Sequence, residues 1–288
     1  LKRFQDGKAV DEILSADNIQ NVAVIGAGYI GVEIAEAAKR RGKNVLLFDA
    51  MKRSLPSYYD KWFTDDMDTI LSEHGIDLHF GELAKEYKGE VKVESIVTDK
   101  GEYSVDLVIN AIGFLPNNEL GKDHLELFKN GAYLVDLHQQ TSDPNVYAVG
   151  DCATIYSNAL QDTTYIALAT NAVRSIFGLH MVSTGLSVEA AAKNGIAVKY
   201  TDFEDLQRPG FMKQNAKVKI RIVYEESSRR VVGAQLSSTE DISGVIHMFS
   251  LAIEEQVTID KLKLLDIFFL PHFNQPYNYI TMAALSAE

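Results

Sequence analysis

The feature that most constrains the fold is the run Gly26-Ala27-Gly28-Tyr29-Ile30-Gly31 and what flanks it. Before it, Asn21–Ile25 is almost continuously apolar, which is typical of a strand buried on both faces. After it, apolar residues at helical spacing (Ile30, Ile34, Ala37 and Ala38) predict a helix to about Arg41. Val45–Phe48 is the next buried strand. This order predicts a βαβ unit with two parallel strands and a right-handed crossover.

Within this unit, three glycines and one aspartate form a dinucleotide-binding fingerprint. Gly26 permits a tight turn, Gly28 lets the backbone approach a pyrophosphate, and Gly31 lets helix and strand pack closely. The free N–H groups at the helix start favour an anion there. Asp49 closes the second strand, 18 residues after Gly31. Its carboxylate can accept hydrogen bonds from both ribose hydroxyls and would repel a 2′-phosphate, so NAD(H) is favoured over NADP(H).

Two alternatives stay open for this fingerprint. Lys52 and Arg53 follow Asp49 and could, as cations, attract a 2′-phosphate, although both also suit a solvated turn. A glycine turn without any ligand is the plainer interpretation of the motif. The complete order of strand, turn, helix and strand favours the binding site.

The rest of the chain shows two patterns. The α/β pattern continues with a helix over 60–74, a strand over 76–80, a hairpin or meander over 91–105 and a buried strand over 107–112. A short buried strand is expected at 146–149, running into Gly150-Asp151, and a helix at 165–174. From about Phe177 the pattern becomes α+β, with strands near 197–201, 218–224 and 230–236 and helices near 243–255 and 258–264.

Composition excludes several classes of function. The net charge of the 288 residues is −12, which disfavours nucleic acids and anionic membrane surfaces as partners. The apolar runs are far shorter than the roughly 20 residues that span a bilayer, and the first residues do not resemble a signal peptide. Cys152 is the single cysteine, which fits a reducing, cytoplasmic location. The seven histidines show no metal-ligand spacing.

Several motifs together resemble one protein family over essentially the whole chain. They are VAVIGAGYIGVEIAEA, LLFDA, VINAIGFLPN, VYAVGDCATIY, YIALATNAVR and FFLPHFNQPYNYITMAAL. In this order they closely resemble the FAD-dependent pyridine nucleotide-disulfide oxidoreductases, most of all the branch of NADH oxidases, NADH peroxidases and coenzyme A-disulfide reductases. The resemblance implies an NAD-binding domain over 1–114, the second segment of an FAD-binding domain over 115–176, and a C-terminal dimerisation domain over 177–288.

The resemblance also implies roles for individual residues toward NAD(H). Tyr29 matches a gate tyrosine that covers the flavin until nicotinamide displaces it, and Glu33 matches a glutamate that reaches the carboxamide. Ile30, Asp49 and Tyr58 match further NAD contacts, and Gly113 matches a glycine on the nicotinamide path. Taken alone, Tyr29 suits a core aromatic, Glu33 a solvated helix acid and Gly113 a strand-end turn.

Further matches imply a flavin site. Gly150 and Asp151 match the segment that holds the ribityl chain of FAD, while the adjacent Cys152 matches a structural position. The matches at the flavin pyrimidine are Leu168, Ala169 and Thr170. Phe273 matches a tail residue that contacts the flavin of the partner subunit in a homodimer, whereas an aromatic run alone more often indicates core or interface. His272 is interpreted as a packing residue.

The chain departs from the family pattern at two places. Nothing before Asn21 matches the family's first FAD-binding half or its redox cysteine, and Ser175-Ile176-Phe177 joins two blocks that the family separates by a couple of dozen residues. The predicted parent activity is transfer of hydride from NADH to FAD, followed by reduction of dioxygen to water. The alternatives are a NADH peroxidase, a coenzyme A-disulfide reductase, or a fragment that binds NAD and dimerises without turnover. A flavin-free NAD dehydrogenase would leave the GDC block and the tail without a purpose.

Overall fold

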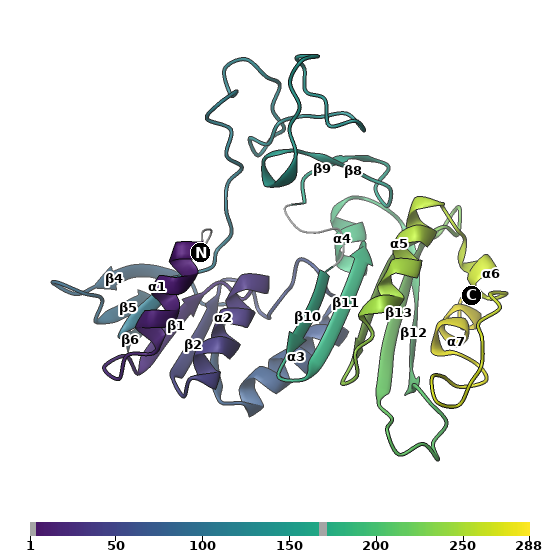
Figure 1. Ribbon diagram of the computed structural model, residues 1–288, viewed down its shortest axis with the longest axis horizontal. Coiled ribbons are helices and arrows are strands. Elements are labelled where there is room, and N and C mark those ends of the chain that lie inside the picture. The colour runs from purple at the N-terminus through teal and green to yellow at the C-terminus, as the bar shows by residue number, and fades with distance from the viewer. Residues whose placement is uncertain (1–3, 167–171) are drawn as a thin grey trace. The chain divides into compact units, whose positions relative to one another are not determined.

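The computed structural model describes residues 4–166 and 172–288, and the chain divides into two compact units (Figure 1). Unit 1 comprises Leu1–Gly113 with Arg174–Leu179, and unit 2 comprises Phe114–Val173 with His180–Glu288. The domain boundaries expected from the sequence stay a prediction.

The centre of unit 1 is a four-stranded parallel sheet in the order β3-β2-β1-β7. Its strands are β1 (Asn21–Ile25), β2 (Asn44–Asp49), β3 (Ile76–Phe80) and β7 (Leu107–Asn110). Helix α2 (Tyr29–Arg40) joins β1 to β2, and α3 (Lys61–Glu73) precedes β3. Helix α1 (Phe4–Leu14) and an antiparallel sheet of β4 (Ala84–Lys88), β5 (Ser95–Thr98) and β6 (Glu102–Ser104) complete the unit. The predicted Rossmann-like βαβ arrangement is confirmed.

Helix α2 packs through its smaller residues. Gly31, Val32, Ala35 and Ala38 are buried, whereas Ile30 is 38% exposed. Small side chains let the helix axis approach the sheet, so the buried face is not the one marked by the isoleucines. The apolar spacing in the sequence therefore predicted the position of the helix correctly. The residues it assigned to one face include both exposed and buried ones.

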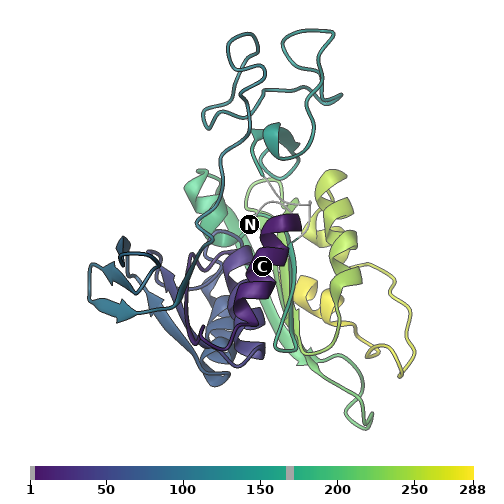
Figure 2. The ribbon, with the colours of Figure 1, turned by 60° about the vertical axis from the view of Figure 1, so that its left-hand side comes forward.

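A five-stranded sheet has the order β10-β11-β14-β13-β12, and its strands β11 to β14 belong to unit 2 apart from Leu179. The strands are β10 (Ala172–Ile176), β11 (Leu179–Gly185), β12 (Val198–Leu206), β13 (Lys217–Glu225) and β14 (Val231–Ser238). The helices are α4 (Val188–Lys193), α5 (Ile246–Glu254), α6 (Ile259–Leu262) and α7 (Tyr279–Leu285). Every residue of β14 is buried, and one core cluster joins β13 and β14 to α5 and α7, which Figure 2 shows in yellow-green and yellow on one side of the strands. The predicted α+β class is confirmed.

Two local expectations are wrong. The apolar run at 146–149 is not a buried strand: Tyr147 is 60% and Val149 69% exposed, and its one bridge is Gln140 to Tyr147. An apolar run becomes a buried strand only where other strands flank it, and the described residues around it give one bridge. The expected helix over 165–174 is also wrong where it is described, because Ala172 opens β10. The segment from 114 to 166 instead has a hairpin of β8 (Ile155–Ser157) and β9 (Asp162–Thr164).

We expect Gly233→Ala to lower the free energy of unfolding by about 2 kcal/mol or more. A Cβ atom at Gly233, the third residue of β14, would lie 1.9 Å from the carbonyl oxygen of Leu186. Urea unfolding followed by circular dichroism measures the loss. Gly244→Ala is the matched control, because a Cβ atom there meets nothing within 4 Å. Equal effects of the two substitutions would contradict the packing argument.

Candidate functional site

The glycine turn lies at the carboxyl end of β1. Gly26 has φ +102°, and a Cβ atom on it would lie 2.5 Å from the carbonyl oxygen of Ala111. A Cβ atom on Gly31 would lie 1.7 Å from the carbonyl oxygen of Gly26, so turn and helix start nearly touch. Gly28 caps α2 without a side-chain hydrogen bond, and a Cβ atom there would meet nothing within 4 Å. The start of α2 therefore borders open space at Gly28, and N–H groups at a helix N-terminus favour an anionic group.

Asp49 is fixed against this turn by main-chain hydrogen bonds. The Ala27 N–H donates to Asp49 Oδ2 at 2.7 Å, and the Met51 N–H donates to Asp49 Oδ1 at 2.7 Å. One residue earlier in each strand-to-turn segment, the Gly26 N–H donates to the Phe48 carbonyl at 2.7 Å. Each carboxylate oxygen keeps acceptor capacity after one such bond. The carboxylate is thus oriented beside the turn and can still accept hydroxyl hydrogens.

The loop of residues 50–60 folds over the same turn and brings further predicted residues to it. The Leu55 N–H donates to the Ala27 carbonyl at 2.9 Å. The ring of Tyr58 lies against that of Tyr29, with 4.1 Å between the ring centroids. Tyr29 is 4% exposed, and the predicted gate tyrosine therefore contacts Tyr58, a predicted NAD contact, at the start of α2.

The other predicted NAD residues also belong to unit 1. Ile30 and Glu33 are exposed in the first two turns of α2. Gly113 follows β7 with φ +99° and is exposed. Of the two cations in question, Lys52 is exposed, while Arg53 donates to the carbonyl oxygens of Tyr59 at 3.1 Å and Pro56 at 3.4 Å. Arg53 therefore has a structural role in the loop.

The predicted flavin residues of unit 2 are exposed where they are described. Gly150 and Asp151 lie in a short 3₁₀ turn, with φ +79° at Gly150. Tyr165 Oη donates to the Asp151 carbonyl at 2.8 Å, and Asp151 as a whole is exposed. An exposed carboxylate next to a glycine fits the hydroxyls of a polyol chain. Phe273 is 57% exposed, and Leu168, Ala169 and Thr170 lie outside the described residues.

Sequence patterns did not reveal a buried cluster behind Asp49. The Glu82 N–H donates to the Asp49 carbonyl at 3.0 Å, and the Glu82 carboxylate is bound by Thr98 Oγ1 at 2.5 Å and contacts His79 Nδ1 at 3.2 Å. The His79 ring stacks on Phe48, with 4.5 Å between centroids. Burial by itself would raise the pKa of Glu82, but hydrogen bonds from Thr98, Tyr103 and His79 hold that pKa below its ordinary value.

Comparison with known proteins identifies the class that this fold and site define. Residues 3–175 match the sequence profile of the pyridine nucleotide-disulphide oxidoreductases, and residues 172–278 match the dimerisation domain of the same family. The chain belongs to this family. It is thus part of an FAD- and NADH-dependent oxidoreductase, and the predicted class of enzyme and the predicted cofactors are confirmed at the level of the family.

Particular relatives are named NADH oxidases. The Lactococcus lactis protein is 59% identical over 317 residues, covering all of this chain and 71% of the relative. The Streptococcus pyogenes protein is 53% identical, covering all of this chain and 69% of the relative. Two solved structures superpose with a TM-score of 0.95: the water-forming NADH oxidase of Lactobacillus brevis bound to NADH, and an engineered water-forming NADPH oxidase bound to NADPH. The first is 32% identical and covers 99% of this chain and 68% of its own; the second is 31% identical and covers 99% and 69%.

The chain is shorter than these relatives in two respects. It spans about 70% of the length of the two curated relatives. The lactococcal alignment extends over 317 residues against 288 in this chain, so the relative has residues inside the aligned region that this chain lacks. That these residues fall near Ser175-Ile176-Phe177 stays a prediction.

Two features of the described residues bear on other functions. In residues 4–166 and 172–288, no helix has the length and apolar character needed to cross a bilayer. The same residues contain no group of three or more His, Cys, Asp or Glu side chains arranged to hold a metal ion.

We expect Glu82→Gln to change how stability depends on pH. Because the fold lowers the pKa of Glu82 from 4.5, the carboxylate stabilises the protein above about pH 4.5, and this contribution is lost as the pH falls through the folded-state pKa. The original chain should exceed the variant in stability near about pH 7 and lose that advantage in acid. Urea midpoints measure it, with Glu86→Gln on exposed β4 as control. A difference that is constant over this range would contradict the expectation.

Proposed function

We propose that this chain provides the NADH site, part of the flavin site and the dimerisation domain of an FAD-dependent NADH oxidase that reduces dioxygen to water. The observation that carries this proposal is the Asp49 carboxylate fixed by the N–H groups of Ala27 and Met51 beside an open glycine turn. FAD, when bound, supplies acceptance of the hydride of NADH and delivery of electrons to dioxygen. The names of the relatives that cover the whole chain support the same activity.

The residues of the glycine turn would bind and orient NADH. Gly28 gives the pyrophosphate access to the N–H groups at the start of α2. Asp49 accepts hydrogen bonds from the ribose hydroxyls. Tyr29 and Tyr58, already in ring contact, cover the nicotinamide side, and Tyr29 moves aside when nicotinamide enters. Glu33 reaches the carboxamide, while Ile30 and Gly113 line the path. Alignment of nicotinamide with the flavin and exclusion of water are what these residues add to the reaction.

The choice of NADH over NADPH is supported by the engineered NADPH oxidase. That enzyme replaces a glycine, then an Asp-Ala-Met run and a proline, and the new residues remove one acid and add two arginines. At the same spacing this chain has Gly31, Asp49, Ala50, Met51 and Pro56, the residue types of the unmodified enzyme. One negative charge and no arginine at these positions disfavours a 2′-phosphate.

The flavin site and the dimer are proposed on similar grounds. Gly150 and Asp151 would hold the ribityl chain of FAD, with Leu168, Ala169 and Thr170 near the pyrimidine. Residues 115–176 would be the second segment of the FAD-binding domain, and exposed side chains such as Leu120 and Val149 would contact the remainder of that domain. The tail, including Phe273, would close the flavin site of the partner subunit in a homodimer. We place the enzyme in the cytoplasm, with dioxygen or peroxide as its small-molecule substrate.

The alternative of a non-catalytic module is supported by the exposure of Gly150 and Asp151. A visible absorption spectrum of the purified chain separates the two. Flavin bands would identify a chain that holds FAD. A colourless protein that binds NADH in calorimetry would be the module, and a folded protein that binds neither would contradict both. A NADH peroxidase or a coenzyme A-disulfide reductase would differ by the product formed per NADH in a flavin-loaded protein.

We expect Asp49→Ala combined with Ala50→Arg to exchange the cofactor preference. Loss of the carboxylate removes the acceptor for the ribose hydroxyls, and the arginine adds a partner for a 2′-phosphate. The dissociation constant for NADH should rise about tenfold or more, and that for NADPH should fall. Calorimetric titration with both nucleotides measures this. Asp66→Ala with Thr69→Arg on α3 makes the same change of charge away from the turn and should leave both constants unchanged. An unchanged affinity for NADH in the Asp49 variant would contradict the site.

A further inference from the structure

A carboxylate outside the predicted site anchors the loop that covers the glycine turn. Asp68 lies on α3 and accepts two hydrogen bonds at one oxygen: from the Ser54 N–H at 3.2 Å and from Ser54 Oγ at 2.5 Å. Ser54 belongs to the loop of residues 50–60 and has no exposed surface. The anchor joins a helix to a loop 14 residues away in sequence.

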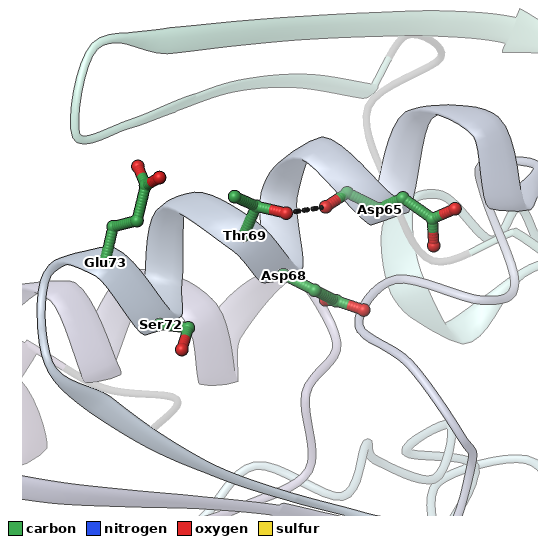
Figure 3. Close-up of a pocket in the computed structure, with 5 residues that line it drawn as sticks. All are labelled: Asp65, Asp68, Thr69, Ser72 and Glu73. Atoms are coloured by element: carbon green, nitrogen blue, oxygen red, sulfur yellow. Dashed lines mark hydrogen bonds between the residues drawn. The ribbon is translucent and has the colours of Figure 1, made fainter.

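Asp68 is set apart from the other polar side chains of α3 around it. Figure 3 shows the hollow lined by Asp65, Asp68, Thr69, Ser72 and Glu73. The Asp68 side chain leaves the helix on a different side from Glu73 and is half-buried, whereas Glu73 is exposed. Burial raises the pKa of Asp68, and the bonds from Ser54 only partly offset that rise. A half-buried carboxylate lowers the stability of the fold, and one explanation for its presence is a contribution to function.

A short series of contacts leads from Asp68 to the proposed dinucleotide site. Ser54 is followed by Leu55, which is fully buried with φ +47° and donates its N–H to the Ala27 carbonyl at 2.9 Å. Ala27 in turn donates its N–H to Asp49 at 2.7 Å. A non-glycine residue in the left-handed region is strained and persists only when its neighbours hold it. Ser54, bound at both its N–H and its hydroxyl, is the neighbour that holds Leu55 from the preceding side. From the following side, the N–H groups of Tyr58 and Tyr59 donate to the Leu55 carbonyl.

We propose that Asp68 is a positioning residue for the dinucleotide: through Ser54 it fixes the loop of residues 50–60 so that Asp49 and Tyr58 are in place before NADH binds. The inference rests on the proposed NADH site and names a residue that does not touch the ligand. Preorganisation of this kind acts on affinity, because the ordering of the loop is completed in the free protein.

The test measures NADH affinity in single and double variants of the whole 288-residue chain. Trp62 is the only tryptophan, so energy transfer to the reduced nicotinamide reports binding from a single tryptophan donor. Asp68→Ala and Ser54→Ala should each raise the dissociation constant about fivefold, and the double variant should be no worse than either alone, because the two residues act as one unit. Asp68→Asn keeps an acceptor oxygen for Ser54 and should stay within about twofold of the original chain.

Control variants and stability measurements separate positioning from general damage. Glu73→Ala removes an equal charge from the same hollow and should leave NADH affinity unchanged. Thermal midpoints are measured for each variant, and Asp68→Asn should be at least as stable as the original chain near neutral pH because it removes a half-buried charge. If Asp68→Ala does not fold, Ser54→Ala, which removes one hydroxyl, gives the same reading.

Two outcomes would overturn the inference. One is NADH affinity that is unchanged in Asp68→Ala and Ser54→Ala. The other is affinity lost additively in the double variant and in step with the thermal midpoint, which would show a role in stability alone. Failure of the unchanged chain to bind NADH is a separate result, since it would remove the proposed function and this inference together.

Discussion

The hydrogen bond from the Ala27 N–H to the Asp49 carboxylate is the contact on which the site depends. It joins the ends of β1 and β2 beyond the last ladder pair, Ile25 with Phe48. The glycine turn can take its shape only because Gly26 and Gly31 lack side chains where each faces a carbonyl oxygen. The loop of residues 50–60 then closes onto the same turn through Leu55. The two glycines thus give the turn before α2 its shape, and the Asp49 carboxylate fixes the orientation of that turn.

The sequence was sufficient for this part of the fold because its determinants are local. A buried strand, a turn that needs glycines and an acid at the next strand end all lie between Asn21 and Asp49, and each leaves a direct trace in residue type. The buried face of α2 was not predicted correctly, because close packing favours Val32 and Ala35 over the larger Ile30. The spacing of apolar residues along the sequence carries no information about how closely the helix approaches the sheet.

Features that depend on distant residues could not be predicted from pattern. The run at 146–149 has the composition of a buried strand, yet Val149 is exposed since a strand needs neighbours that the run does not specify. No sequence pattern singled out Glu82 or Asp68, because their roles come from Thr98, His79 and Ser54, which only the fold brings to them. Family resemblance assigned the enzyme class and the cofactors, which no single motif of this chain determines.

The double use of the Asp49 carboxylate links cofactor choice to the integrity of the turn. Its two oxygens already satisfy the N–H groups of Ala27 and Met51 in the free protein. A sequence that exchanged this acid for a neutral residue would leave both donors without their acceptor, and unsatisfied main-chain donors are costly. A phosphate on the ribose would bring new acceptor oxygens to the place where that carboxylate stood. In a variant that binds a 2′-phosphate, the phosphate oxygens would then accept the hydrogen bonds that the Asp49 carboxylate had accepted. The glycine turn of such a variant would be least ordered when no dinucleotide is bound.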